Sequence, residues 1–136
     1  MNKTVLITGA TSGIGLGCAR KFAANGDRLI LTGRNSQKLE TIKEELESKG
    51  TAVLTLSFDV RDREAAAKAI ANLPLEWQQI DVLVNNAGLA LGLEPEFEGN
   101  FDDWETMIDT NIKGLLTMTR LIVPAMVKRN SGHILI

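Results

Sequence analysis

The feature that most constrains this chain is an apolar run that ends in a glycine-rich turn. Val5–Thr8 is typical of a buried strand, and Gly9, Gly13 and Gly15 follow it with the spacing G-x-x-x-G-x-G. A helical pattern begins at the turn, and the first N–H groups of a helix have no partner within it. Because these groups and the helix dipole attract anions, this order predicts a phosphate-binding turn. The alternative is an ordinary connection between a strand and a helix.

The rest of the chain alternates short apolar runs with amphipathic stretches. Strands are predicted at 4–8, 28–32, 52–58, 81–85 and 133–136, and helices begin near residues 13, 36, 62 and 102. Such alternation forms a parallel sheet through right-handed crossovers. We therefore predict an α/β fold of the Rossmann type, a doubly wound parallel sheet between two helical layers, in which the chain ends in the fifth strand.

Composition excludes several classes of protein. The 136 residues suffice for one domain, and a net charge of −2 without a basic stripe argues against a nucleic-acid partner. The apolar runs are too short for a membrane span, so none is predicted. Strand-like residues follow Met1 directly, so no signal peptide is predicted either. The single cysteine, Cys18, is expected to pack in the first helix, and a chain without disulfides favours the cytoplasm. No metal site is predicted.

Polar residues follow the predicted strands at the edge where a parallel sheet binds ligands. The glycine turn, residues 32–34, Asp59 and Asn85–Gly88 all lie at carboxyl ends of strands. Ligands of open α/β sheets bind at this edge, where the strand order reverses. The convergence of four separate segments supports a binding site there more strongly than any one of them.

These residues together resemble the short-chain dehydrogenase/reductase family. Four segments match its motifs in the family's order, namely Thr8–Gly15 (T-G-x-x-x-G-I-G), Asp59–Val60, Asn85–Gly88 (N-N-A-G) and Asn111 within Asp109–Gly114. Segments 73–77, 88–92 and 103–107 are similar to the bacterial NADP-dependent serine or 3-hydroxy acid dehydrogenases. The resemblance implies an oxidoreductase that transfers a hydride between NADP(H) and a small alcohol or carbonyl substrate, such as a 3-hydroxy acid or a serine-like hydroxy amino acid.

The resemblance also implies which residues hold the cofactor. They are Gly9, Thr11, Ser12, Gly13, Ile14 and Gly15 at the pyrophosphate, Asp59 and Val60 at the adenine, and Asn86, Ala87 and Gly88 beside the nicotinamide ribose. The Asp59 carboxylate would accept from the adenine amino group. An aspartate in this place can equally cap the next turn.

The end of the second strand predicts NADP rather than NAD. Sites that select NAD place an acid about 20 residues after the glycines, where it holds the ribose 2′-hydroxyl. This chain has Thr32-Gly33-Arg34-Asn35 there, with no carboxylate. The Arg34 guanidinium can meet a 2′-phosphate with paired, charge-assisted hydrogen bonds, and Lys38 offers a second cation. The alternative is that Arg34 is a solvated loop residue.

Of the catalytic residues that the resemblance implies, only one has a match in this sequence. Asn111 matches the family's asparagine, which bends its helix and whose backbone carbonyl helps to hold a water against a lysine. The alternative is that Asn111 is an ordinary residue of the helix whose side chain faces solvent. The chain contains no tyrosine, and the family's serine, tyrosine and lysine are expected beyond Ile136. Residues 1–136 are therefore predicted to be the N-terminal part of one NADP-binding Rossmann domain, inactive alone.

The predicted helix from 103 to about 129 is apolar on more than one side. This pattern fits burial against the sheet and a further helix, or a subunit contact such as the homotetramer that the family habit implies. Two other functions stay open: an inactive NADP-binding sensor with the same cleft, and a structural subunit that pairs through this helix. The preceding loop, 89–103, has no cation for a substrate carboxylate, so the hydroxy-acid preference depends on the resemblance alone.

Overall fold

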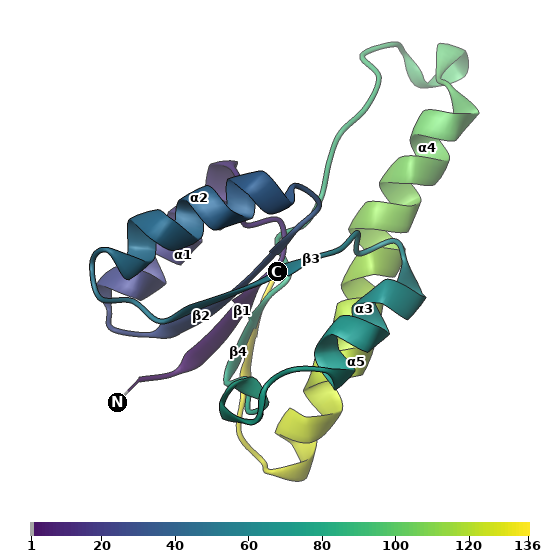
Figure 1. The fold of residues 1–136 in the computed structure, drawn as a ribbon. Helices are drawn as coiled ribbons and strands as arrows, with labels where there is room; N and C mark the ends of the chain where they lie inside the picture. Colours follow the sequence, from purple (N-terminus) through teal and green to yellow (C-terminus); the bar gives the residue numbers. More distant parts are fainter. Residues whose placement is uncertain (1) are drawn as a thin grey trace.

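Five parallel strands form one sheet in the order β3-β2-β1-β4-β5 in the computed structural model, which describes residues 2–136 (Figure 1). The strands are β1 (Thr4–Ile7), β2 (Arg28–Gly33), β3 (Val53–Ser57), β4 (Val82–Val84) and β5 (His133–Leu135). The strand order reverses between β1 and β4, which is where ligands bind in doubly wound sheets. The predicted Rossmann-type α/β fold is confirmed, and each strand lies within one residue of its predicted ends.

Helices cover both faces of this sheet. They are α1 (Gly13–Ala24), α2 (Ser36–Glu47), α3 (Arg63–Ala71), α4 (Phe101–Ile108) and α5 (Leu115–Lys128), with short 3-10 turns η1 (Leu75–Trp77) and η2 (Glu96–Glu98). Figure 1 shows α1 and α2 on one face and α3 and α5 on the other, while α4 and the loop before it project beyond the sheet.

The core consists of two apolar layers that the central strands separate. Val5 and Ile7 of β1 face a cluster that includes Leu39 of α2, whereas Leu6 faces a cluster that includes Met118 and Ile122 of α5. The three β1 residues are fully buried. Successive strand residues point to opposite faces of the sheet, so the sequence of a strand that is covered on both faces is an unbroken apolar run. This explains why the strands were predictable from the sequence.

The long C-terminal helix differs from the prediction at its start. It begins at Phe101 rather than at Asp102 or Asp103, because the Asn100 side chain caps it and accepts from the N–H groups of Asp102 at 2.7 Å and Asp103 at 3.3 Å. It also contains a π-helical turn, η3 (Asp109–Gly114), between α4 and α5. No helix within residues 2–136 is long and apolar enough to cross a bilayer.

Candidate functional site

A cleft of about 440 Å³ lies at the carboxyl edge of the sheet. Every predicted cofactor-binding residue except Gly15 lines it, and Gly15 lies buried behind the cleft wall. The lining residues are Gly9, Thr11, Ser12, Gly13, Ile14, Thr32, Gly33, Arg34, Phe58, Asp59, Val60, Asn86, Ala87, Gly88, Leu89 and Thr110. The fold thus brings the ends of β1, β2, β3 and β4 to a single hollow, whereas Lys38 is not in its wall.

The glycine turn leaves no room for side chains at two of its glycines. Gly9 has φ +62°, and a Cβ there would lie 2.9 Å from the Ala87 Cα. A Cβ on Gly15 would lie 2.1 Å from the Gly9 carbonyl oxygen, far inside van der Waals contact. Gly13 has φ +56°, but a Cβ there would meet no atom within 4 Å. Gly9 and Gly15 therefore let the turn close, while Gly13 faces open space at the cleft.

The N-terminus of α1 is the part of the turn that can bind an anion. Side chains of Asn35, Asp62 and Asn100 cap α2, α3 and α4, whereas the Ser12 side chain makes no capping hydrogen bond to α1. The first turn of α1 also carries no acidic residue. Neither the capping residue nor the first turn of α1 therefore offsets the partial positive charge of this helix end, whose residues Ser12, Gly13 and Ile14 border the cleft.

A buried threonine joins the glycine turn to the segment after β4. The Thr8 hydroxyl accepts from the N–H groups of Asn86 at 3.0 Å and Ala87 at 2.9 Å. The Asn86 side chain donates in return to the carbonyls of Thr8 at 3.2 Å and Gly9 at 3.0 Å. Four hydrogen bonds across almost 80 positions of sequence thus fix two walls of the cleft relative to each other.

The opposite end of the cleft is built from charged side chains. Arg34 follows β2 and Asp59 follows β3, and both line the cleft. Hydrogen bonds from the Arg61 side chain lower the pKa of the Asp59 carboxyl below its usual value. Partial burial opposes this, while the Arg61 N–H and the charges of Arg61 and Arg34 add to it. Asp59 is therefore an ionised acceptor held among cations.

Asn111 lies in the π-helical turn and contacts the loop after β4. Its side-chain oxygen accepts from the Leu89 N–H at 2.9 Å, and its amide nitrogen donates to the Leu89 carbonyl at 2.9 Å. A Cβ on Gly114, at the end of the same turn, would lie 2.7 Å from the Val60 Cγ2. The π turn therefore packs closely against two segments of the cleft wall.

A model of the short chain dehydrogenase family matches residues 3–136. The chain belongs to this family. The NADP-dependent 3-hydroxy acid dehydrogenase YdfG of Salmonella typhi is 56% identical over 131 residues, which are 96% of this chain and 52% of that protein. The serine 3-dehydrogenase of Rhizobium radiobacter is 47% identical over 129 residues, 95% of this chain and 51% of that protein. The chain thus spans about half the length of these relatives.

Solved structures of the short chain dehydrogenase family share this fold. The serine dehydrogenase of Escherichia coli superimposes with a TM-score of 0.91 at 51% identity, covering 96% of this chain and 59% of that one. A closed form of serine dehydrogenase complexed with NADP+ gives the same TM-score and identity, with 96% and 52% covered. The backbone described here is therefore that of an established family.

Three features of this short-chain dehydrogenase cleft were not predicted from the sequence. They are the Thr8 hydroxyl that ties two walls together, the Arg61 side chain on Asp59, and the side-chain contacts of Asn111 with Leu89. The polar Thr8 at the end of an apolar strand was the one available signal. Among residues 2–136 no group of three or more His, Cys, Asp or Glu side chains is placed to hold a metal ion.

Proposed function

We propose that this chain supplies the NADP-binding part of a short-chain dehydrogenase that transfers a hydride between NADP(H) and a small alcohol or carbonyl substrate. One observation carries the proposal. Phosphate-binding features at α1 and a guanidinium after β2 border the same cleft, in a chain whose relatives are named as NADP-dependent enzymes.

The residues of the glycine turn fit a diphosphate. The N–H groups at the start of α1, including that of Ile14, would donate to it, and the Thr11 and Ser12 hydroxyls lie beside them on the cleft. Open space in front of Gly13 allows close approach to the backbone. Asn86, Ala87 and Gly88 would lie along the ribose on the nicotinamide side. When bound, the nicotinamide ring supplies the hydride chemistry.

The adenosine end fits a 2′-phosphate better than a 2′-hydroxyl. Arg34 borders the cleft at the end of β2, and Thr32 and Gly33 beside it carry no charge. A guanidinium binds a phosphate through paired, charge-assisted hydrogen bonds, whereas a carboxylate in its place would repel the anion. Asp59 would accept from the adenine amino group, with Val60 beside it.

We further propose that residues 1–136 are the N-terminal part of a single NADP-binding domain. The resemblance assigns Asn111 to the catalytic group and would place the serine, tyrosine and lysine after Ile136. The substrate class follows the names of the relatives, which act on 3-hydroxy acids or serine. A substrate carboxylate would need a cation, and the loop from 89 to 103 has none.

The test is hydride transfer by the protein expressed from its complete coding sequence. We expect absorbance at 340 nm to rise with serine or a 3-hydroxy acid and NADP+, far faster than with NAD+. The isolated 136-residue chain should be inactive. NADP+ binding without turnover on any small alcohol would favour the sensor, and no binding would contradict the proposal.

The same proposal includes a homo-oligomer, a tetramer by analogy with the family, that forms through the long helix, in a protein of the cytoplasm. Four apolar side chains spaced four residues apart are exposed on it: Trp104 36%, Ile108 44%, Ile112 54% and Leu116 58%. Light scattering of the complete protein and its Ile112→Lys variant tests this. We expect a tetramer that dissociates in the variant, and a monomeric wild type would contradict it.

A further inference from the structure

We propose that Arg61 is a positioning residue that fixes the Asp59 carboxylate as an acceptor and so makes the cleft prefer an adenine to a 6-oxopurine. The inference deepens the proposed function and depends on it, since it concerns Asp59 in the same cleft. Arg61 itself does not line that cleft. It would act through Asp59.

Arg61 contacts both oxygens of the Asp59 carboxylate. Its Nη2 donates to Oδ2 at 2.7 Å, and its Nε lies 3.0 Å from Oδ2 and 3.2 Å from Oδ1. Its backbone N–H donates to Oδ1 at 2.9 Å. A carboxylate held through two oxygens by a planar guanidinium and a backbone N–H cannot rotate freely.

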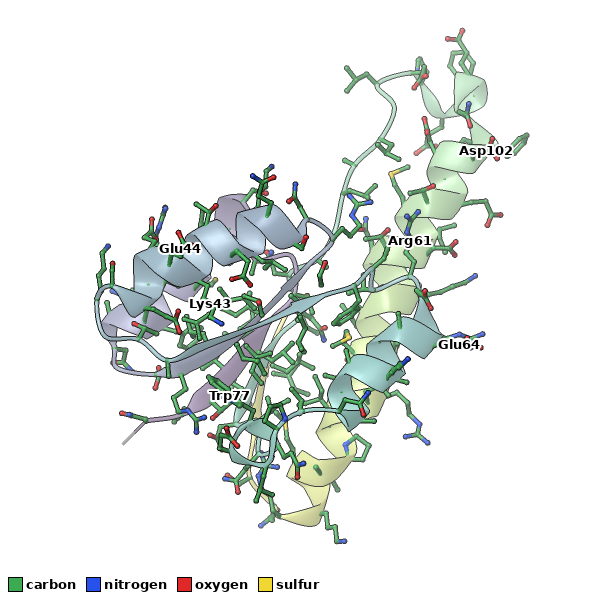
Figure 2. The ribbon with its side chains drawn as sticks, in the orientation of Figure 1. Lys43, Glu44, Arg61, Glu64, Trp77 and Asp102 are labelled. Carbon is green, nitrogen blue, oxygen red and sulfur yellow. The ribbon has the colours of Figure 1, made fainter. Side chains whose placement is uncertain are left out.

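The turn that carries both residues is itself anchored. Asp62 N–H donates to the Asp59 carbonyl at 2.9 Å, and Val60, between the two charged residues, is 8% exposed and packs in the core cluster beside α3 and α5. Arg61 lies beside the helix that contains η3 (Figure 2). The hydrogen bond and charge of Asp59 raise the pKa of the Arg61 guanidinium, and the charge of Asp109 in η3 adds to this. Two acids, one adjoining β3 and one in η3, thus favour the charged guanidinium.

This arrangement determines what Asp59 can bind. An ionised carboxylate is an acceptor only, with about four lone-pair sites. Three Arg61 N–H donors occupy most of these sites. Asp59 can therefore accept few further hydrogen bonds, and only from a fixed direction. The exocyclic amino group of adenine can donate to the remaining site, whereas the carbonyl oxygen of a 6-oxopurine would face a negative oxygen.

The test compares the Kd of NADP+ with that of nicotinamide hypoxanthine dinucleotide phosphate, by calorimetry on the protein from its complete coding sequence. We expect the wild type to prefer the adenine form by about 10-fold, the value of one hydrogen bond to a charged group. Arg61→Met should lower this preference to less than about 3-fold. Arg63→Met, two residues along and without a contact to Asp59, should keep it.

Two further variants separate positioning from general loss of structure. Asp59→Ala should remove the preference, and adding Arg61→Met to it should change the ratio no further, because Arg61 acts through Asp59. Arg61→Lys, with a charge but no planar fork, should be intermediate and serves if the methionine variant does not fold. A structural defect would weaken both nucleotides equally and leave the ratio unchanged.

Each outcome bears on a different claim. A wild type that binds neither nucleotide contradicts the proposed function and with it this inference. A wild type that binds both equally overturns the role of Asp59 and of Arg61, while NADP binding stands. A preference that survives in both Arg61 variants overturns the inference about Arg61 alone.

Discussion

Backbone groups form one end of the cleft, whereas side chains form the other. At the glycine turn, the main chain at the start of α1 and close glycine contacts form the wall, and a Cβ on Gly15 would overlap the Gly9 carbonyl. At the opposite end, the side chains of Arg34 and Asp59 line the cleft, and Arg61 holds Asp59 from outside it. A site made of backbone cannot be altered without altering the fold, whereas a site made of side chains can change its preference while the fold persists.

The largest expected effect is at the glycine turn. Gly15→Ala places a Cβ 2.1 Å from the Gly9 oxygen, so the turn must move. We expect a loss of about 3 kcal/mol or more in the free energy of unfolding, as for severe overpacking, together with loss of NADP+ binding. Chemical denaturation measures the first quantity.

Gly17→Ala is the matched control in the same helix. A Cβ at Gly17 meets nothing within 4 Å. Alanine there should stabilise the protein by about 0.5–1 kcal/mol, since it favours the helix. If both variants behaved alike, the close contact at Gly15 would not explain its glycine.

The local structure of the glycine turn could be predicted from the sequence better than the contacts of Asp59, for a physical reason. The local sequence of Val5–Gly15 favours a strand, a turn and a helix in that order, so its conformation could be predicted without knowledge of the fold. The Asp59 contacts with Arg61 depend on side-chain geometry, and both the cofactor role and the turn-capping role were open for Asp59. The N–H of Arg61 on its carboxylate shows that it does close a turn.

Long-range contacts explain the other features that were missed. The Asn111 side chain meets Leu89 across 22 positions, and Thr8 meets Ala87 across 79. No local pattern predicts the π turn either, because periodicity places Trp104, Ile108 and Ile112 on one regular helix. Such contacts become visible only once the sheet order brings β1 beside β4.

Arg34→Ala should give the next largest effect, and it should act on preference rather than on folding. Loss of a charge-assisted pair should weaken NADP+ by about 10- to 100-fold, while NAD+, which lacks the 2′-phosphate, changes little. Calorimetry with both cofactors measures this. Equal losses would mean that Arg34 supports the fold rather than recognising the phosphate.

A smaller effect is expected where the π turn meets the cleft. Asn111→Ala removes two exposed hydrogen bonds to Leu89, which should cost about 1 kcal/mol of unfolding free energy. Exchange of the Leu89 amide hydrogen should accelerate. Asn111→Asp keeps the acceptor for that amide and should preserve more of its protection; unchanged exchange in both variants would refute the contact.

The smallest effect concerns pH. Because the folded-state pKa of Asp59 is depressed by Arg61, the pair stabilises the protein above the unfolded pKa of aspartate, about 4, and this contribution disappears as pH falls through the folded value. Arg61→Met should therefore lower stability by less than about 1 kcal/mol at neutral pH. The difference from wild type, followed by urea unfolding, should shrink below about pH 4; a constant difference would contradict this.

The most direct test of the account is a crystal structure of the protein from its complete coding sequence with NADP+. We predict the diphosphate on the N–H groups at the start of α1, between Gly13 and Ile14, and the 2′-phosphate against the Arg34 guanidinium. A nucleotide bound outside the cleft, or a 2′-phosphate turned away from Arg34 into solvent, would contradict it.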